Sequence, residues 1–266
     1  MPTNCQSCPV RRDGLCASIA DEQLSMMVGL KRPPRTIHAG ANVFLEGEQN
    51  DLVYIIRRGW AVASTLHENG RRQVLRFAMP SNLVGFATRS DGSMPCTVEA
   101  VTELIVCPIP RRKLLQLCQE VPTLALCIAS QFATETITDW QLLGALGTCN
   151  AAERIARLFL TLCNLQRRED ASNTPDLVLP ISQTIIADAT GLTAVHVCRT
   201  LKEMRLAGLL TFAKGRLRVL DWARLARLAE MKDVAVAPLS HALAIRQRGR
   251  PARAGWAGPI GADLAP

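Results

Sequence analysis

Three of the ten cysteines in this 266-residue chain stand close together near its N-terminus. Cys5, Cys8 and Cys16 follow a C-x2-C-x7-C spacing, which places three potential thiolate ligands on one short segment. Three thiolates leave a four-coordinate site one ligand short, so we expect a fourth from the folded body. The candidates are Cys107, in LIVCPIP, and Cys96, in MPCTVEA. We expect the set to hold an iron–sulfur cluster.

Other chemistries of the same thiols stay open. Thiolates at such spacings also hold structural zinc or form a thiol–disulfide switch. Residues 1–20 carry little apolar surface, and Pro9 and Gly14 interrupt regular structure, so we expect a cysteine-rich arm that becomes ordered around its metal. A cysteine nucleophile would need a neighbouring base. The four histidines form no pattern with a cysteine, and the sequence therefore argues against an enzyme.

Charge and hydrophobicity set the broad class of protein. The net charge of +8 and the isoelectric point near 9.2 favour an anionic partner, with nucleic acid ahead of a membrane surface. Apolar stretches are short and interrupted, so we expect no membrane-spanning segment, and the N-terminus does not have the pattern of a signal peptide. We therefore expect a cytoplasmic protein. Its length allows two domains and a connecting element.

The region 21–120 is expected to form a small antiparallel barrel or roll. A short helix is expected at 21–30, and the hydrophobic pattern then has a period of two, which is typical of strands. Strands are expected at 41–45, 52–56, 61–65, 73–77, 97–100 and 104–107. Asn69-Gly70, between two of these runs, predicts a tight hairpin. Short strands at such regular spacing are typical of a closed antiparallel sheet.

A long helix is expected at 121–148, and one of its faces has the spacing of a coiled coil. Steps of three and four residues lead along this face through Ala125, Ile128, Phe132, Glu135, Asp139, Leu142 and Leu146. If the helix pairs in parallel with a second copy, Asp139 meets its own counterpart. The like charges would then hold the homodimer near its dissociation threshold. Alternatively, the two acids flank the contact and stay solvated.

Residues 149–230 predict a winged helix–turn–helix domain. Asn150 followed by Glu153 forms a variant capping box, and Gly191 stands in the turn between two helices. The expected elements are helices at 150–167, 182–191, 193–205 and 221–230 and a hairpin at 209–220. Residues 231–266 are rich in proline, glycine, alanine and arginine and predict a disordered tail.

This order of elements resembles the Crp/Fnr superfamily of bacterial transcription regulators, and the cysteine arm makes the chain similar to the oxygen-sensing Fnr branch. The local matches are NLVGF at 82–86, ELIVCPIP at 103–110, NAAER at 150–154 and GLTAVHVCRTL at 191–201. The resemblance covers about residues 1–230. It implies an α+β fold with a cyclic-nucleotide-binding-like β-roll, a long dimerisation helix and a C-terminal winged helix–turn–helix.

In the Fnr branch, three N-terminal cysteines and one at the end of the roll bind a 4Fe–4S cluster. The resemblance therefore implies Cys5, Cys8, Cys16 and Cys107 as ligands, and it favours Cys107 over Cys96. It also implies that oxygen degrades the cluster, loosens the homodimer and releases double-stranded DNA, with RNA polymerase as a further partner. A family member with a vestigial cluster site and constitutive DNA binding is the alternative.

Residues around the site fit that chemistry. Arg11 and Arg12 are expected to keep the thiolates deprotonated, and Leu15 is expected to shield the cluster from solvent and oxidant. The branch that binds cyclic nucleotides needs a glutamate and an arginine–serine pair in the roll. The stretch at 85–96 lacks the glutamate, and Arg89-Ser90 does not stand at the matching end, so a cyclic nucleotide is not expected.

The second helix of the motif is expected to read DNA. Arg199 matches the family's base-reading arginine, which can pair with a guanine edge in the major groove. Val195 stands where the family usually has a glutamate and can contact a thymine methyl instead. His196 also departs from the pattern, so the half-site should differ from the usual Fnr-type site or be looser. Thr193 and Lys214 are expected to contact phosphates.

Overall fold

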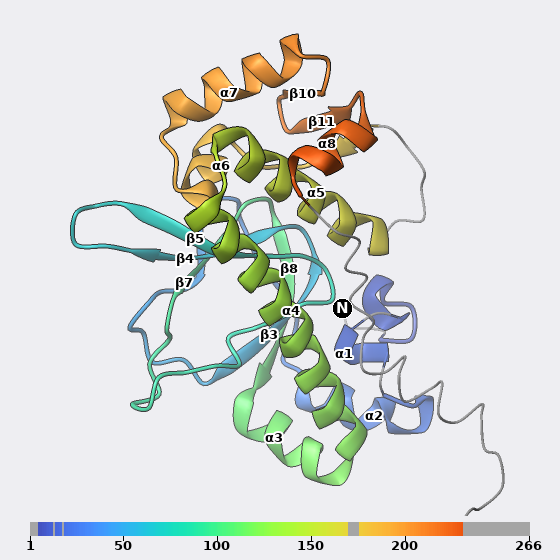
Figure 1. The fold of residues 1–266 in the computed structure, drawn as a ribbon. Coiled ribbons are helices and arrows are strands. Elements are labelled where there is room, and N and C mark those ends of the chain that lie inside the picture. Colours follow the sequence, from blue (N-terminus) through green and yellow to red (C-terminus); the bar gives the residue numbers. More distant parts are fainter. Residues whose placement is uncertain (1–4, 13, 18, 170–175, 231–266) are drawn as a thin grey trace, which may run out of the picture.

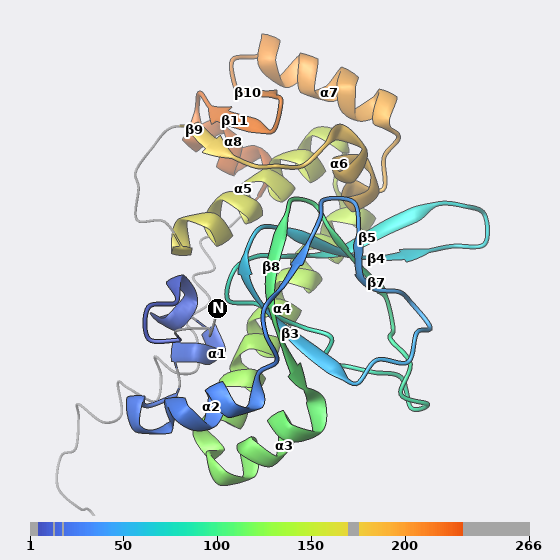
Figure 2. The same ribbon diagram turned by 180° about the vertical axis from the view of Figure 1, so that it is seen from behind.

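The computed structural model describes residues 5–12, 14–17, 19–169 and 176–230. A single long helix, α4 (Pro122–Thr148), runs through the molecule with the β-roll beside it and the winged domain near its C-terminal end (Figure 1). The N-terminal helices lie beside the other half of α4, as the view from behind also shows (Figure 2). The tail expected to be disordered, 231–266, lies outside the described residues.

Two four-stranded antiparallel sheets form the β-roll, with strand orders β1-β8-β3-β6 and β2-β7-β4-β5. The strands are β1 (Arg35–Ile37), β2 (Asn42–Phe44), β3 (Leu52–Arg58), β4 (Ala61–Leu66), β5 (Arg72–Ala78), β6 (Leu83–Val84), β7 (Thr97–Ala100) and β8 (Leu104–Pro110). All six expected strands are present. The pattern missed β1 and β6 because runs of three and two residues are too short to show a period of two.

The expected hairpin joins β4 to β5. Gly70 adopts φ +77°, and the N–H of His67 donates to the carbonyl of Arg71 at 2.9 Å. A left-handed residue at this place is what a tight hairpin requires, and glycine adopts it without steric cost.

The helices α3 (Arg111–Glu120), α4 and α5 (Ala151–Glu169) follow the roll. Pro122 stands in the first turn of α4, where its missing N–H leaves no intrahelical bond unmade. Asn150 and Glu153 form the expected reciprocal cap of α5. The N–H of Glu153 donates to Asn150 Oδ1 at 3.1 Å, and the N–H of Asn150 donates to Glu153 Oε2 at 2.8 Å. The cap separates α5 from α4, so the chain can turn into the winged domain.

The winged domain consists of β9 (Asp176–Val178), α6 (Gln183–Thr190), α7 (Ala194–Leu206), β10 (Leu210–Ala213), β11 (Arg216–Val219) and α8 (Trp222–Leu228). Gly191 ends α6 at φ +66°, and the hydroxyl of Ser182 caps its beginning by accepting from the N–H of Ile185. The strand β9 was not expected, because its sequence follows a polar loop. It completes an antiparallel sheet of order β10-β11-β9.

A continuous hydrophobic core joins the winged domain to the roll. Phe159 of α5 and Leu201 of α7 belong to the same core as Val62 of β4 and Phe77 of β5. The two domains are therefore packed together through apolar contacts. In the part of the chain that the structure describes, no helix is both long and apolar enough to cross a membrane.

Candidate metal centre and nucleic-acid interface

The N-terminal arm is folded against the body of the protein. It contains a 3-10 turn, η1 (Pro9–Arg12), and a one-turn helix, α1 (Gly14–Ala17). The guanidinium of Arg11 donates to the carbonyl oxygens of Cys16 and Ile19 and pairs with the carboxylate of Asp21. Arg11 therefore clamps the arm around Cys16. Arg12, which was also expected to keep the thiolates deprotonated, has a side chain outside the described part of the structure.

Apolar residues on the underside of the arm pack into a core shared with α4. Leu15 is 1% exposed and lies in one core with Ile109 of β8 and Ile128 of α4. Gly14 adopts φ +53°, and a Cβ at this position would lie 2.8 Å from the carbonyl oxygen of Ser81. Glycine is therefore needed for the arm to approach the roll this closely.

The four expected ligands lie in the same region of the structure, where their thiols interact electrostatically. Cys5, Cys16 and Cys107 are buried, and Cys8 is half-buried. Cys107 lies in β8 opposite Ile55 of β3, so a paired strand holds the fourth thiol in position. Negative charge on Cys8 and Cys16 acts on Cys107, and negative charge on Cys8 and Cys5 acts on Cys16, as expected of sulfurs that lie close together.

Cys96, the alternative fourth ligand, lies elsewhere in the roll. It packs against the core between the two sheets, and the charges that act on its thiol come from Glu46, Arg76 and Arg89. None of these three groups belongs to the arm. The sulfur that meets the arm is that of Cys107.

Burial raises the pKa of Cys16 and raises the pKa of Cys107 to about 11. The positive charge of Lys31 opposes the shift on both thiols because it favours the thiolate form. Among the described residues, no group of three or more histidine, cysteine, aspartate or glutamate side chains could hold a metal ion. The four expected ligands do not form such a group as they stand, but they are all sulfur and mostly buried, and four cysteine thiolates are the donors that hold an iron–sulfur cluster.

The stripe of α4 that the sequence suggested as a dimer seam faces the protein's own core. Ile128 is 6% exposed in the core under the arm, and the ring of Phe132 lies 5.6 Å from that of Phe86, centroid to centroid. Leu142 packs against the core of the winged domain, and Leu146 lies next to Gly191. In the described structure these side chains pack within the chain itself, and their contact with a second copy stays a prediction. Two adjacent stripes of α4 share the same spacing, so the pattern could not tell the inner stripe from the outer one.

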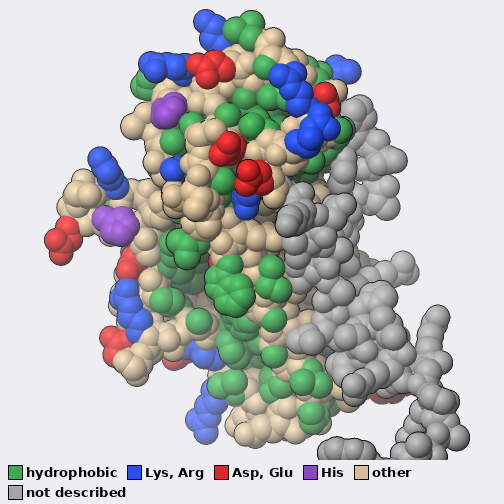
Figure 3. All heavy atoms as spheres, in the orientation of Figure 1, with side chains coloured by type: hydrophobic (Ala, Val, Ile, Leu, Met, Phe, Trp, Pro, Cys, Tyr) green, Lys and Arg blue, Asp and Glu red, His purple; other side chains and the backbone are tan. Residues whose placement is uncertain are grey.

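The adjacent stripe of α4, one residue further along the chain, is apolar and exposed. Leu126, Trp140 and Leu143 are 53%, 67% and 66% exposed. Steps of three and four residues connect them along the helix through Leu126, Ala129, Ala133, Thr136, Trp140, Leu143 and Gly147. Hydrophobic side chains gather along the course of α4 in the space-filling view (Figure 3). Such spacing is what a helix needs to pack lengthwise on a second helix.

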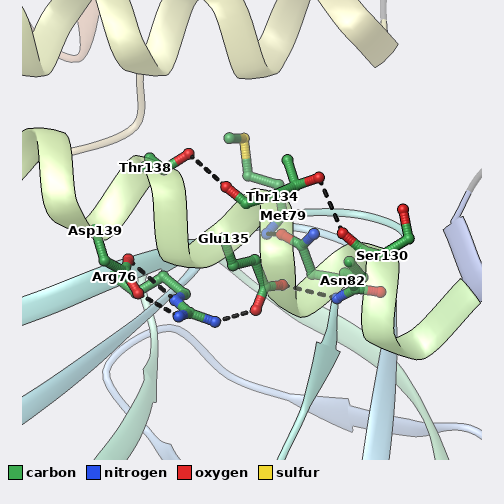
Figure 4. A network of polar contacts seen from close by, with 9 residues as sticks. Arg76, Met79, Asn82, Ser130, Thr134, Glu135, Thr138 and Asp139 are labelled. Carbon is green, nitrogen blue, oxygen red and sulfur yellow. Dashed lines mark hydrogen bonds and ion pairs between the residues drawn. The ribbon is translucent and has the colours of Figure 1, made fainter. Parts of the chain in front are cut away.

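The acids of α4 are bound by the roll of the same chain. The guanidinium of Arg76 in β5 donates to the carboxylates of both Glu135 and Asp139 (Figure 4). Burial raises the pKa of Glu135, and the positive charge of Arg76 opposes that shift. One guanidinium serves two carboxylates, so the group keeps a single net negative charge. The repulsion expected between two copies of Asp139 is therefore reduced within each chain.

A second arginine of β5 holds the winged domain. Arg72 Nε lies 3.0 Å from Asp188 Oδ2 of α6, and its Nη1 lies 2.5 Å from Glu99 Oε2 of β7. Arg72 and Arg76 stand four residues apart in β5, and the register of this strand against β4 shifts between them. Through them, β5 contacts both α4 and the helix–turn–helix.

The helix α7 presents an exposed face suited to a DNA groove. Val195, His196 and Arg199 are exposed, whereas Val197 and Leu201 are buried in the winged domain. The core side of α7 thus fixes which side chains point outward.

The two residues expected to contact phosphates, Thr193 and Lys214, are at the start of α7 and in the wing. The hydroxyl of Thr193 caps α7 by accepting from the N–H of His196 at 3.2 Å. Lys214 is exposed in the wing turn at φ +49°. Two further cationic side chains, Lys202 and Arg216, are also exposed and were not among the expected DNA contacts. The sequence contained a hint of Lys202, because a residue three positions after Arg199 lies on the same face of a helix.

A β-roll joined through a long helix to a winged helix–turn–helix defines a sensor-linked DNA-binding regulator. The cyclic nucleotide-binding domain family matches residues 34–121, and the Crp-like helix-turn-helix domain family matches residues 153–228. The transcriptional activator protein FnrL of Cereibacter sphaeroides is 30% identical over 230 residues, which cover 83% of this chain and 90% of that protein. The chain therefore belongs to the Crp/Fnr family, whose members are transcription regulators and not enzymes.

Two further comparisons agree. An anaerobic regulatory protein of Pasteurella multocida is 25% identical over 228 residues, covering 85% of this chain and 82% of that protein. The solved structure of FixK2 from Bradyrhizobium japonicum has a TM-score of 0.66 and 24% identity, covering 75% of this chain and 98% of that one, which supports the fold. The match to the cyclic nucleotide-binding family likewise describes the roll. Within it, Arg89 pairs with Glu46 at 2.6 Å.

Proposed function

We propose that this Crp/Fnr regulator senses oxygen or redox state through a 4Fe–4S cluster held by Cys5, Cys8, Cys16 and Cys107, and that the cluster controls dimerisation and DNA binding. One observation carries the proposal. The arm is folded against the body so that the thiols of Cys8 and Cys16 interact electrostatically with the buried thiol of Cys107 on a paired strand, which supports the proposed ligand set. The name of the Pasteurella relative, an anaerobic regulatory protein, fits oxygen as the signal.

When bound, the cluster supplies an oxygen-labile centre, and its thiolate bonds tie the arm to β8. The chain's own residues pass this tie on to α4. Leu15 packs in the core that contains Ile128, and the thiol of Cys127 lies 3.6 Å from the carbonyl oxygen of Gly14. Without the ligand bonds, the arm keeps its apolar packing against α4 and the roll and its hydrogen bonds, but loses the covalent tie to β8. The packing of the arm against the first half of α4 then changes, because the tie no longer holds it.

The outer face of α4 is the proposed contact with a second copy of the chain. Leu126, Trp140 and Leu143 supply large apolar side chains, and Ala129 and Ala133 let two helix backbones come close. The arm packs against one stripe of this helix, and the proposed contact is the adjacent stripe. Loss of the arm's support therefore changes the dimer without any direct contact between cluster and partner.

The homodimer is proposed to bind double-stranded DNA with two copies of α7. Arg199 would pair with a guanine edge, Val195 and His196 would contact neighbouring bases, and Thr193 and Lys214 would contact phosphates. The exposed positions of these side chains and the net charge of +8 support this assignment. We further propose that the regulator acts in the cytoplasm and contacts RNA polymerase at its promoters.

Purification without oxygen tests the sensing half of the proposal. The protein should be brown, contain close to four iron atoms per chain, and lose its visible absorption in air. Cys107→Ala should abolish the absorption and the iron, and Cys96→Ala is the matched control that should retain both. The opposite result for the two variants would reject Cys107 as the ligand.

DNA-binding measurements test whether the proposed cluster controls the winged helix–turn–helix domain. Binding to a cognate operator should weaken in air for the wild type. Colourless protein that contains zinc would support a structural metal instead, and equal DNA affinity with and without oxygen would support constitutive binding. Either outcome rejects the cluster mechanism.

A further inference from the structure

We propose that Lys31 is a positioning residue of the thiol site: its ammonium group donates to sulfur, holds the arm's cysteines next to Cys107, and slows oxidative loss of the cluster. The inference rests on the proposed function and extends it to a residue that is not a ligand.

The backbone of Lys31 is held next to the fourth ligand. The helix α2 (Leu24–Leu30) ends one residue earlier, and Lys31 itself is extended at φ −74°, ψ 138°. The N–H of Arg32 donates to the carbonyl oxygen of Pro108 at 2.9 Å. Pro108 follows Cys107 in β8, so this bond fixes Lys31 against the strand that carries the fourth thiol.

The side chain of Lys31 reaches from the strand to the arm. Its Nζ lies 3.7 Å from Cys5 Sγ and 3.8 Å from Cys16 Sγ, and the residue is half-buried. An ammonium group has three donors and can serve two sulfurs at once. The donors of Arg11 are used elsewhere, on carbonyl oxygens of the arm and on Asp21. Lys31 therefore brings a positive charge to the sulfur atoms themselves.

The geometry brings a cation to this place. A lysine side chain carries a full positive charge as an ammonium group, and the atoms that this charge faces are the sulfurs of Cys5 and Cys16.

The consequence for a bound cluster follows from electrostatics. Four thiolates gather negative charge in a site that is mostly shielded from water, and a cation hydrogen-bonded to sulfur stabilises the more negative redox state. The potential of an iron–sulfur cluster depends on net charge and on hydrogen bonds to its sulfurs. Lys31 therefore raises the midpoint potential and makes oxidation less favourable.

The test compares anaerobically purified wild type with Lys31→Met, Lys31→Arg and Arg32→Met. Arg32 is exposed, so Arg32→Met removes a neighbouring positive charge without removing the sulfur contact. The readouts are iron content, midpoint potential by optical titration, and the rate of bleaching in air.

Lys31→Met should have a more negative potential and bleach roughly tenfold faster, the effect expected for one charge-assisted hydrogen bond. Lys31→Arg should lie closer to the wild type, and Arg32→Met should match it. Equal behaviour of Lys31→Met and wild type, or an equal effect of Arg32→Met, overturns the inference while the proposed function stands. Wild-type protein without iron overturns both.

Discussion

Removal of the Arg76 guanidinium tests how the sensor roll is tied to α4. In Arg76→Ala, the side chain of Glu135, 12% exposed, stays at the roll with its charge unpaired, and Asp139 loses the same partner. Exposed ion pairs contribute about 0–1 kcal/mol, and removing one partner of a buried pair costs about 3–5 kcal/mol. Arg76 is 32% exposed and partly screened by solvent, so we expect a loss of about 2 kcal/mol of unfolding free energy.

Thermal unfolding followed by circular dichroism measures this loss. For a chain of this size, such a change lowers the melting temperature by roughly 4–8 °C. Arg71→Ala is the matched control, because Arg71 is exposed in the adjacent hairpin, and its unfolding free energy should stay within about 0.5 kcal/mol of the wild type.

The stability difference between wild type and Arg76→Ala should depend on pH in a defined direction. Burial raises the pKa of Glu135, and Arg76 lowers it, so the pKa rises further in Arg76→Ala. A carboxyl group whose pKa is higher in the folded than in the unfolded state contributes stability at low pH that is lost as the pH rises through the folded pKa. The stability gap between wild type and Arg76→Ala should therefore be widest near neutral pH and narrow toward about pH 5. Arg76→Ala as stable as Arg71→Ala, or a gap independent of pH, would refute the reasoning.

Three further outcomes follow from the site. Leu143→Asp should weaken self-association at least about tenfold in sedimentation equilibrium, because it places a charge in the exposed stripe of α4. The control Leu115→Asp, at an exposed position of α3, should leave self-association unchanged. Cluster reconstitution, followed by visible absorption, should become more complete as the pH rises from about 6.5 to 8.5. Cys16 and Cys107 have raised pKa values and must lose their protons to bind iron, so an extent of reconstitution that does not change with pH would contradict this. Arg199→Ala should lower the affinity for the operator by about 1–3 kcal/mol relative to random DNA, and an equal loss on both would exclude base readout.

Local patterns were sufficient for most elements. Alternation predicted six of the eight strands of the roll, Asn69-Gly70 predicted the hairpin, and Asn150 with Glu153 predicted the start of α5. These features depend on neighbours in the sequence, so a short window contains all of the relevant physics. The strands β1, β6 and β9 were missed because a few residues cannot display a period and pairing with distant strands stabilises them.

The orientation of α4 shows the limit of such patterns. A step of three and four residues fits both of its stripes, and the pattern favoured the one that contains Ile128 and Phe132. Packing against the arm and the roll buries that stripe, which leaves Trp140 and Leu143 outside. The choice depends on which neighbouring surface offers apolar contacts, and the helix sequence does not contain that information.

The cysteine spacing by itself predicted a metal-binding arm, which stays a prediction, and the strand and turn signals and the helix caps predicted the β-roll and the winged DNA-binding domain. Tertiary structure decided which distant groups meet. It brought Cys107 rather than Cys96 to the arm, placed the ammonium group of Lys31 among the sulfurs, and bound Asp139 to Arg76. Charges and thiols act over a few ångströms in space, and positions tens of residues apart in the chain come that close only when the sheets and helices pack.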